Sequence, residues 1–290
     1  MHDVLIRNAL VLDGNDRPGR HGDVAVRDGR IVAVGAVDGG ARQVIDAGGR
    51  ALAPGFIDVH THDDLEVLRN PGMASKLSQG VTTVVVGNCG ISASPVRIRG
   101  EVPDPMNLLG EAGDFRYADF ASYRQAVETA RPAVNVAALV GHTALRQNHM
   151  DRLDRAATAG EIEAMRAQLR ASLAQGALGL SSGLAYGSAF HAPSTEVAEL
   201  ARELPHGGLY ATHLRDEFGG ILAALDEAFD AARAPQAAVR VSHLKCAGID
   251  NWGRSREVLH RLDAASGNQD VACDCYPYAA SASTLDLKQV

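Results

Sequence analysis

The sequence predicts an α/β protein in which a small β-domain, residues 1–53, precedes a larger domain, residues 54–290, of alternating strands and helices. Short β-branched segments separated by Asp-Gly turns fill the first part, which is typical of a small β-domain. After Ala53-Pro54-Gly55, apolar strands alternate with helix-length amphipathic segments, which indicates βα units around a parallel sheet. The length of 290 residues also accommodates one α/β barrel, which needs about 250.

The small β-domain contains three clear strand patterns. We place these strands at residues 4–11, 23–26 and 31–34. Asp28-Gly29 separates the second strand from the third, and an Asp-Gly pair between apolar segments predicts a tight hairpin.

The larger domain contains seven predicted strands in βα order. They lie at residues 56–59, 82–86, 134–140, 177–180, 209–211, 239–241 and 271–275. The helix before the fourth strand has a capping box formed by Thr158 and Glu161, apolar residues at helical spacing, and Gly176 as its stop. A second helix is expected around residues 221–229, between the fifth and sixth strands.

Composition and charge exclude several classes of protein. Apolar residues make up 46% and charged residues 22% of the chain, as in ordinary globular proteins. The net charge of −7 provides no basic surface, so we expect neither nucleic acid nor membrane as a partner. The N-terminus lacks the pattern of a signal peptide, which predicts a cytoplasmic location. The four cysteines are then reduced, and metal ligation or burial is their expected role.

Polar side chains gather at or just past the ends of the predicted strands. In strand order they are His60 and His62, Cys89, His142, Ser181 and Ser182, His213, His243, and Tyr276. The carboxyl ends of parallel barrel strands face the same way, and active sites are built there. Because histidine and cysteine are good zinc ligands, the pattern points to a metal centre.

His60-Thr61-His62 is the sharpest of these elements. Residues i and i+2 of an extended segment point to the same face, so both imidazoles can reach one metal ion. Two solvated or packed histidines are the alternative. The further histidine and cysteine candidates at strand ends favour the metal.

Cys89, His213 and His243 form a second candidate set. A cysteine after a buried strand is often an inert core thiol, and a single histidine at a strand end is often only packed. Glycines on both sides of Cys89 allow close approach, and a thiolate can bridge two cations. Together the three residues supply three ligands and leave a position open for water, as hydrolytic zinc requires.

Other candidates have weaker support from the sequence. Cys273 and Cys275 share one strand face, and a core position is the favoured interpretation for them. For His142 a structural hydrogen bond is at least as good an explanation as metal binding. Asp63 and Asp64 either orient a ligand imidazole or are solvated loop acids.

The chain resembles the amidohydrolase superfamily and, within it, the N-acyl-D-amino-acid deacylases, or D-aminoacylases. The segments that carry the resemblance are GFIDVHTHDD (55–64), GVTTVVVGNCG (80–90), GALGLSSGL (176–184), THLRDE (212–217), SHLK (242–245) and DCYPY (274–278). Together they extend over nearly the whole chain, and their combination is specific, although His-x-His alone marks only the superfamily.

The resemblance implies a metal-bearing (β/α)8 TIM-type barrel beside a small N-terminal β-sandwich. It implies zinc at Cys89, His213 and His243, and allows a second, weaker metal site at His60 and His62. Dihydroorotases and dihydropyrimidinases instead carry a carboxylated lysine after the fourth strand. This chain has Ser181-Ser182 there, so Cys89 would take the bridging role.

The resemblance also implies substrate-binding residues and a missing end. The substrate-binding residues would be Lys245, Tyr186, Tyr276 and Ser283. Gly187-Ser188 stands where the family usually has two prolines, a difference that bears on acyl specificity. The family places its catalytic aspartate on an eighth strand, which would lie beyond Val290. We therefore expect a C-terminally truncated chain with an incomplete β-domain.

The function implied is zinc-dependent hydrolysis of the amide bond of N-acyl-D-amino acids, which gives a carboxylate and a free D-amino acid. One alternative is a cyclic-amide hydrolase of the dihydroorotase or dihydropyrimidinase type. Another is a non-catalytic, truncated metal-binding homologue.

Overall fold

The computed structural model describes residues 1–98 and 100–280. The chain divides into two compact units, Met1–Phe56 and Ile57–Val290. Each unit is described by itself. Among the described residues, no helix combines the length and apolar character needed to cross a membrane.

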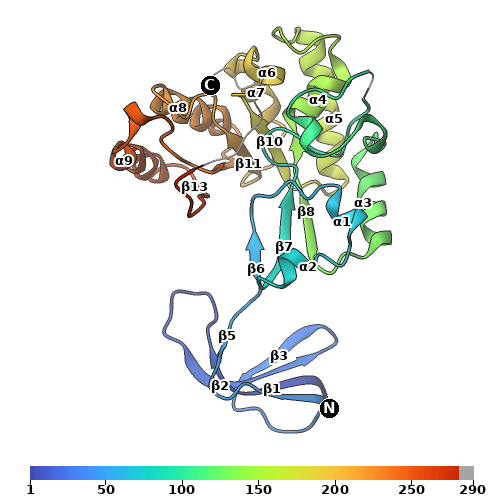
Figure 1. Ribbon diagram of the computed structural model, residues 1–290, viewed down its shortest axis with the longest axis vertical. Coiled ribbons are helices and arrows are strands. Elements are labelled where there is room, and N and C mark those ends of the chain that lie inside the picture. The colour runs from blue at the N-terminus through green and yellow to red at the C-terminus, as the bar shows by residue number, and fades with distance from the viewer. Residues whose placement is uncertain (99, 281–290) are drawn as a thin grey trace. The chain divides into compact units, whose positions relative to one another are not determined.

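The first unit is one five-stranded mixed sheet (Figure 1). Its strands are β1 (His2–Val11), β2 (Arg20–Arg27), β3 (Arg30–Gly35), β4 (Ala41–Asp46) and β5 (Ala51–Leu52). The order is β3-β2-β1-β4, and β5 also pairs with β1. Asp28 and Gly29 have φ values of 52° and 70° in the antiparallel β2–β3 hairpin. Both are left-handed, as a type I′ turn requires, so the hairpin prediction is confirmed.

The described residues of the second unit form two sheets whose strands neighbour one another in chain order. Its strands are β6 (Phe56–Asp58), β7 (Val81–Val86), β8 (Asn135–Ala138), β9 (Val140–Gly141), β10 (Gly179–Gly183), β11 (Leu209–His213), β12 (Ala238–Val241) and β13 (Val271–Cys273). The sheets are β6-β7-β8 and β9-β10-β11-β12-β13, and the pairs from β7 to β8 and from β9 to β13 are parallel. Leu139, between β8 and β9, donates its amide hydrogen to Val86 of β7.

Helices connect the strands of the second unit, as βα order requires. They are α1 (Glu66–Arg69), α2 (Ala74–Leu77), α3 (Phe120–Ala130), α4 (His142–His149), α5 (Ala159–Ala174), α6 (Gly187–Phe190), α7 (Ser194–Ala201), α8 (Ile221–Arg233) and α9 (Ser255–Ser266). In the described part of the chain, 3₁₀ turns occupy Met106–Leu108, Ala112–Asp114 and Ile249–Asn251. Helix α8 contacts β12 and α9 contacts β13, so each helix packs on a neighbouring strand.

The two helices predicted from the sequence are present. Thr158 caps α5: its hydroxyl oxygen accepts from the Glu161 amide at 3.3 Å, and Glu161 Oε2 accepts from the Thr158 amide at 2.7 Å. Gly176, with φ of 104°, follows the helix end. Helix α8 buries Ile221, Leu225 and Phe229 among its inward-facing residues.

Several strand boundaries were predicted wrongly, among them that of the fifth strand, which is Leu209–His213 rather than 209–211. The segment 134–140 breaks at Leu139 into β8 and β9. The segment 271–275 is a strand only to Cys273. The fourth strand is Gly179–Gly183 rather than 177–180, so Ser181 and Ser182 lie within it and are buried. Glycine has low strand propensity, and so the bounds of this strand could not be read from the sequence.

Candidate metal centre

The predicted ligands all lie at the carboxyl ends of strands in the second unit. His60 and His62 follow β6, and Cys89 follows β7. His213 is the last residue of β11, and His243 comes two residues after β12. The five side chains therefore meet at one end of the parallel strands, where α/β proteins build their sites.

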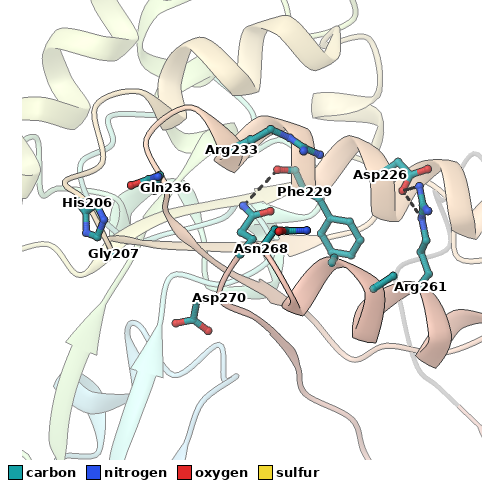
Figure 2. A pocket seen from close by; sticks show the side chains of 12 residues that line it. His206, Gly207, Asp226, Phe229, Arg233, Gln236, Arg261, Asn268 and Asp270 are labelled. Atoms are coloured by element: carbon teal, nitrogen blue, oxygen red, sulfur yellow. Dashed lines mark hydrogen bonds and ion pairs between the residues drawn. The ribbon is translucent and has the colours of Figure 1, made fainter.

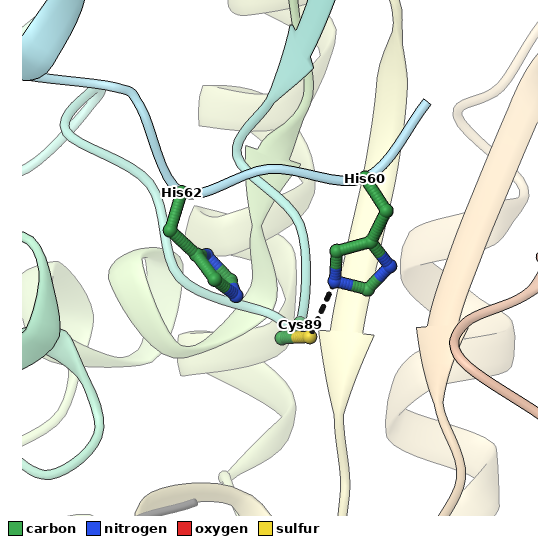
Figure 3. A group of neighbouring side chains, drawn as sticks. All are labelled: His60, His62 and Cys89. Carbon is green, nitrogen blue, oxygen red and sulfur yellow. Dashed lines mark hydrogen bonds between the residues drawn. The ribbon is translucent and has the colours of Figure 1, made fainter. Parts of the chain in front are cut away.

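His60, His62 and Cys89 form one group of possible ligands (Figure 3). Their ligand atoms all lie within 4.8 Å of one another. Nε2 of His60 is 3.2 Å from Sγ of Cys89. The two imidazole rings are 5.6 Å apart and nearly perpendicular, so both histidines reach toward the thiol from the same segment.

Cys89, His213 and His243 form a second group. Their ligand atoms also lie within 4.8 Å of one another. Nε2 of His243 is 3.6 Å from Sγ of Cys89, and the rings of His213 and His243 are 4.4 Å apart. Cys89 is therefore common to both groups, the position that a bridging thiolate requires.

The residues of both groups fit a zinc ion. Zinc–sulfur and zinc–nitrogen bonds of about 2.3 and 2.1 Å in a tetrahedral site put neighbouring ligand atoms about 3.5 Å apart. The sulfur–nitrogen separations of 3.2 and 3.6 Å, to His60 and His243, lie close to that value. Nδ1 of His62 is buried without a hydrogen-bond partner among the described residues, which leaves it available as a ligand atom.

The backbone around Cys89 is held in unusual conformations. Cys89 and His243 have φ values of 54° and 38°, in the left-handed region that residues other than glycine rarely adopt. The Cys89 loop packs tightly on β10: a Cβ atom on Gly183 would lie 2.2 Å from the Cys89 carbonyl oxygen. Such strain at a group of possible ligands is typical of a functional site.

Electrostatics around Cys89 favour the thiolate. Burial by itself raises the pKa of this thiol, but hydrogen bonds with the surrounding imidazoles, that of His213 foremost, lower it well below its usual value. Burial lowers the pKa of His60, whereas its bonds to Asp274 and Cys89 outweigh this and raise the pKa to about 10. Burial also lowers the pKa of His243, but its interactions with Cys89 and Glu217 outweigh this and raise the pKa to about 9.

Two carboxylates at the site were not assigned to it from the sequence. Asp274 lies 3.3 Å from Nδ1 of His60 through Oδ2, and its Oδ1 accepts the His243 amide hydrogen at 2.6 Å. Oε1 of Glu217 lies 3.0 Å from Nδ1 of His243. Both carboxylates thus contact the ring nitrogen remote from Cys89, as the partners that orient metal ligands do. The sequence signals were the position of both residues within segments that carry the family resemblance, THLRDE (212–217) and DCYPY (274–278), and the spacing of Glu217 four residues after His213.

The structure places three of the four predicted substrate-binding residues around the second group. The Tyr186 hydroxyl is 3.2 Å from Nδ1 of His213 and is buried. Lys245 donates from Nζ to Oε2 of Glu217 at 2.6 Å, and its Nζ lies 5.7 Å from the centre of the Tyr276 ring. Ser283 lies outside the described residues.

The acids next to the histidine pair are structural. Asp64 is buried and accepts the amide hydrogens of Gly87 and Ala93, so it ties the His62 segment to the Cys89 loop. Burial raises its pKa to about 6. The alternative of a solvated loop acid is therefore wrong for Asp64. Asp63 instead forms an ion pair with Lys76 at 3.0 Å.

Three further candidates, His142, Cys273 and Cys275, do not belong to either group of possible ligands. His142 is completely buried and its Nε2 is 2.9 Å from Glu196, which supports the structural hydrogen bond that the sequence left open. Cys273 and Cys275 are exposed, so their expected core position is wrong. Side chains alternate along the extended segment, which turns the intervening Asp274 inward.

A cavity of about 640 Å³ lies elsewhere, between α8, α9 and the segments that precede β11, β12 and β13 (Figure 2). It therefore lies at the amino ends of these strands, opposite the ligand groups. Two of its charged side chains pair with each other, Arg261 donating to Asp226 at 2.6 Å. None of the predicted site residues that the structure describes lines this cavity. The cavity is therefore separate from the two groups of possible ligands.

Comparison with known proteins agrees with this geometry. The chain is 46% identical over 290 residues to D-aminoacylase of Alcaligenes xylosoxydans xylosoxydans, covering 99% of this chain and 60% of that protein. A D-aminoacylase structure described in terms of a binuclear metal centre superposes with a TM-score of 0.93 at 48% identity, covering 96% of this chain and 59% of that one. The structure of N-acyl-D-glutamate deacylase of Bordetella bronchiseptica, complexed with zinc and a phosphonate inhibitor, superposes with a TM-score of 0.89 at 42% identity. The match covers 96% of this chain and 59% of that one.

Parallel strands with possible histidine and cysteine ligands at their carboxyl ends, together with these superpositions, define an α/β fold of the amidohydrolase type. The model of the amidohydrolase family matches residues 43–279, and the chain belongs to that family. It spans about 60% of the length of the curated D-aminoacylase that it matches.

Proposed function

We propose that the protein is a zinc-dependent hydrolase that cleaves the amide bond of N-acyl-D-amino acids into a carboxylate and a free D-amino acid. The observation that carries the proposal is the pair of ligand groups that share Cys89. Similarity to D-aminoacylase supports the substrate class and the D configuration. Zinc in the N-acyl-D-glutamate deacylase structure supports the choice of metal.

The tight zinc site is proposed at Cys89, His213 and His243. Cys89 and His213 are buried, whereas both histidines of the other group are partly exposed. We therefore assign a second, weaker site to His60 and His62, with Cys89 shared. Zinc held at these residues acts as a Lewis acid that polarises the scissile carbonyl and makes water a better nucleophile at neutral pH.

The protein side chains around the zinc site supply orientation and charge. Asp274 and Glu217 fix the rings of His60 and His243 through their outer nitrogens. Lys245 offers its ammonium group to the α-carboxylate of the substrate, as an ion of opposite charge. Tyr186 and Tyr276 border the same space, and Ser283 is proposed as the fourth substrate contact.

A carboxylate that carries the proton to the leaving amine completes the reaction. The resemblance assigns this role to an aspartate, and that assignment stays a prediction. Asp216 is unsuited to the role because its carboxylate accepts the amides of Phe218 and Gly220 before α8. Asp274 already contacts two possible ligands.

The finer architecture belongs to the same proposal. We propose that the strands from β6 to β13 belong to a (β/α)8 TIM-type barrel, and that the N-terminal sheet belongs to a β-sandwich. We also propose that the boundary between the two domains lies between residues 53 and 54, as expected from the sequence.

Hydrolysis assays test the proposed function. The purified full-length protein is incubated with N-acetyl-D-methionine, N-acetyl-L-methionine and dihydroorotate, and the products are separated by chromatography. We expect release of D-methionine that stops after treatment with a chelator and returns with zinc. His260→Ala, a change at an exposed histidine of α9, serves as the control that retains activity. Preferred hydrolysis of dihydroorotate, or equal rates with and without chelator, would contradict the proposal.

A further inference from the structure

Glu217 contacts two side chains of different proposed roles. Its Oε1 lies 3.0 Å from Nδ1 of His243, and its Oε2 accepts from Nζ of Lys245 at 2.6 Å. Only 9% of the Glu217 side chain is exposed.

Nδ1 of His243 also lies 3.0 Å from Nζ of Lys245. The opposite ring nitrogen, Nε2, is the one that faces Cys89. A neutral imidazole that gives the lone pair of Nε2 to a metal carries its hydrogen on Nδ1. Glu217 can accept that hydrogen, whereas the ammonium group of Lys245 has only hydrogens to offer. The carboxylate therefore supports the metal-binding form of His243, and the ammonium opposes it.

We propose that Glu217 is a positioning residue that holds His243 in its metal-binding form, and that Lys245 weakens this hold until a substrate carboxylate draws its ammonium group away. The inference rests on the proposed function, because the carboxylate belongs to an N-acyl amino acid. A fifth of the Lys245 side chain is exposed, so the ammonium group is accessible to such a ligand. The Glu217 carboxylate thereby couples substrate binding at Lys245 to the metal affinity of the site that includes His243.

Zinc affinity measured without substrate tests the proposal. The wild type is compared with Glu217→Gln, which removes the charge at constant shape, and with Lys245→Met, which mimics withdrawal of the ammonium group. Glu203→Gln is the matched control: Glu203 is also 9% exposed and binds the two arginines Arg166 and Arg170, away from the ligand groups. Each protein is titrated with zinc against a chromophoric chelator, and its thermal melting is recorded.

The two variants are expected to change the zinc affinity in opposite directions. Glu217→Gln raises the dissociation constant about 10- to 100-fold, the usual effect of losing the partner of a metal-binding histidine. Lys245→Met lowers it about threefold or more. Glu203→Gln leaves it unchanged. A wild-type constant in Glu217→Gln, or weaker binding in Lys245→Met, overturns the proposal. Because no substrate is present, either result is separate from a failure to hydrolyse N-acyl-D-amino acids.

Discussion

Nε2 of His60 lies 3.2 Å from Sγ of Cys89, although 29 positions separate the two residues in the chain. The contact joins the end of β6 to the loop after β7 and places one thiol in both groups of possible ligands. It makes Cys89 the residue on which both proposed metal sites depend.

Replacing Cys89 should therefore remove more zinc than replacing either histidine of the weaker site. We expect Cys89→Ala to lose nearly all bound zinc, because both ligand groups lose their sulfur. His60→Ala should keep the zinc held by Cys89, His213 and His243. Elemental analysis after gel filtration measures the difference, and full zinc content in Cys89→Ala would refute the assignment.

Lys245→Ala should impair substrate binding more than metal binding. Loss of a charge-assisted hydrogen bond costs about 1.5–3 kcal/mol, which raises KM about tenfold or more. The change in kcat should be smaller, and zinc should remain bound. Steady-state kinetics of the zinc-loaded enzyme check this, and an unchanged KM would reject a role in carboxylate binding.

The close packing of the Cys89 loop on β10 predicts a large effect of one methyl group. In Gly183→Ala the new Cβ atom would lie 2.2 Å from the Cys89 carbonyl oxygen, so the loop must move. We expect zinc affinity to fall about tenfold or more. Gly160→Ala in α5, where a Cβ atom meets no neighbour within 4 Å, should bind zinc as the wild type does. Equal affinity in both variants would show that the loop adapts without loss.

The buried ion pair of Glu196 and Arg146 predicts a stability effect away from the ligand groups. Both side chains are completely buried, and Glu196 also contacts His142 and the Ala157 amide. Glu196→Gln should lower the free energy of unfolding by about 3–5 kcal/mol, because Arg146 keeps its buried charge without its partner. Urea denaturation measures the change. Asp154→Asn, at an exposed pair with Arg152, should have little effect.

The effect of Glu196→Gln should also depend on pH. Burial acts to raise the pKa of Glu196, but His142 and Arg146 hold it at about 2 in the folded protein, below the ordinary 4.5. A lowered folded-state pKa contributes stability that is complete above about pH 4.5 and is lost as the pH falls toward 2. The difference in the free energy of unfolding between wild type and Glu196→Gln should therefore become smaller as the pH falls from 6 to 3. A constant difference would contradict this origin of the stability.

The sequence analysis grouped the possible ligands that lie together in the structure, whereas it did not find the carboxylates around them. His60 and His62 could be paired because extended residues i and i+2 share a face, and strand ends brought Cys89 and His243 into the same set. Glu217 could not be assigned because its contacts depend on the loop after β11. Asp274 could not be distinguished from its neighbours in the sequence. Its role became visible only through its contacts with the His60 imidazole and the His243 amide.

The fold was predicted where periodicity was strong. Helix α5 and the β2–β3 hairpin follow from a capping box and an Asp-Gly turn. Strand β10 was misplaced because its glycines allow a close approach to β11 that no local pattern announces: a Cβ atom on Gly179 would lie 2.0 Å from the Leu209 carbonyl oxygen. Tertiary packing decided this boundary, and local propensity did not.

Stepwise zinc addition to metal-free protein, followed by the release of D-methionine from N-acetyl-D-methionine, tests the central claim most directly. We predict that activity is absent without zinc, rises as the site of Cys89, His213 and His243 fills, and is absent at every zinc concentration in Cys89→Ala. Hydrolysis by the metal-free protein, or full zinc-dependent activity in Cys89→Ala, would contradict the account.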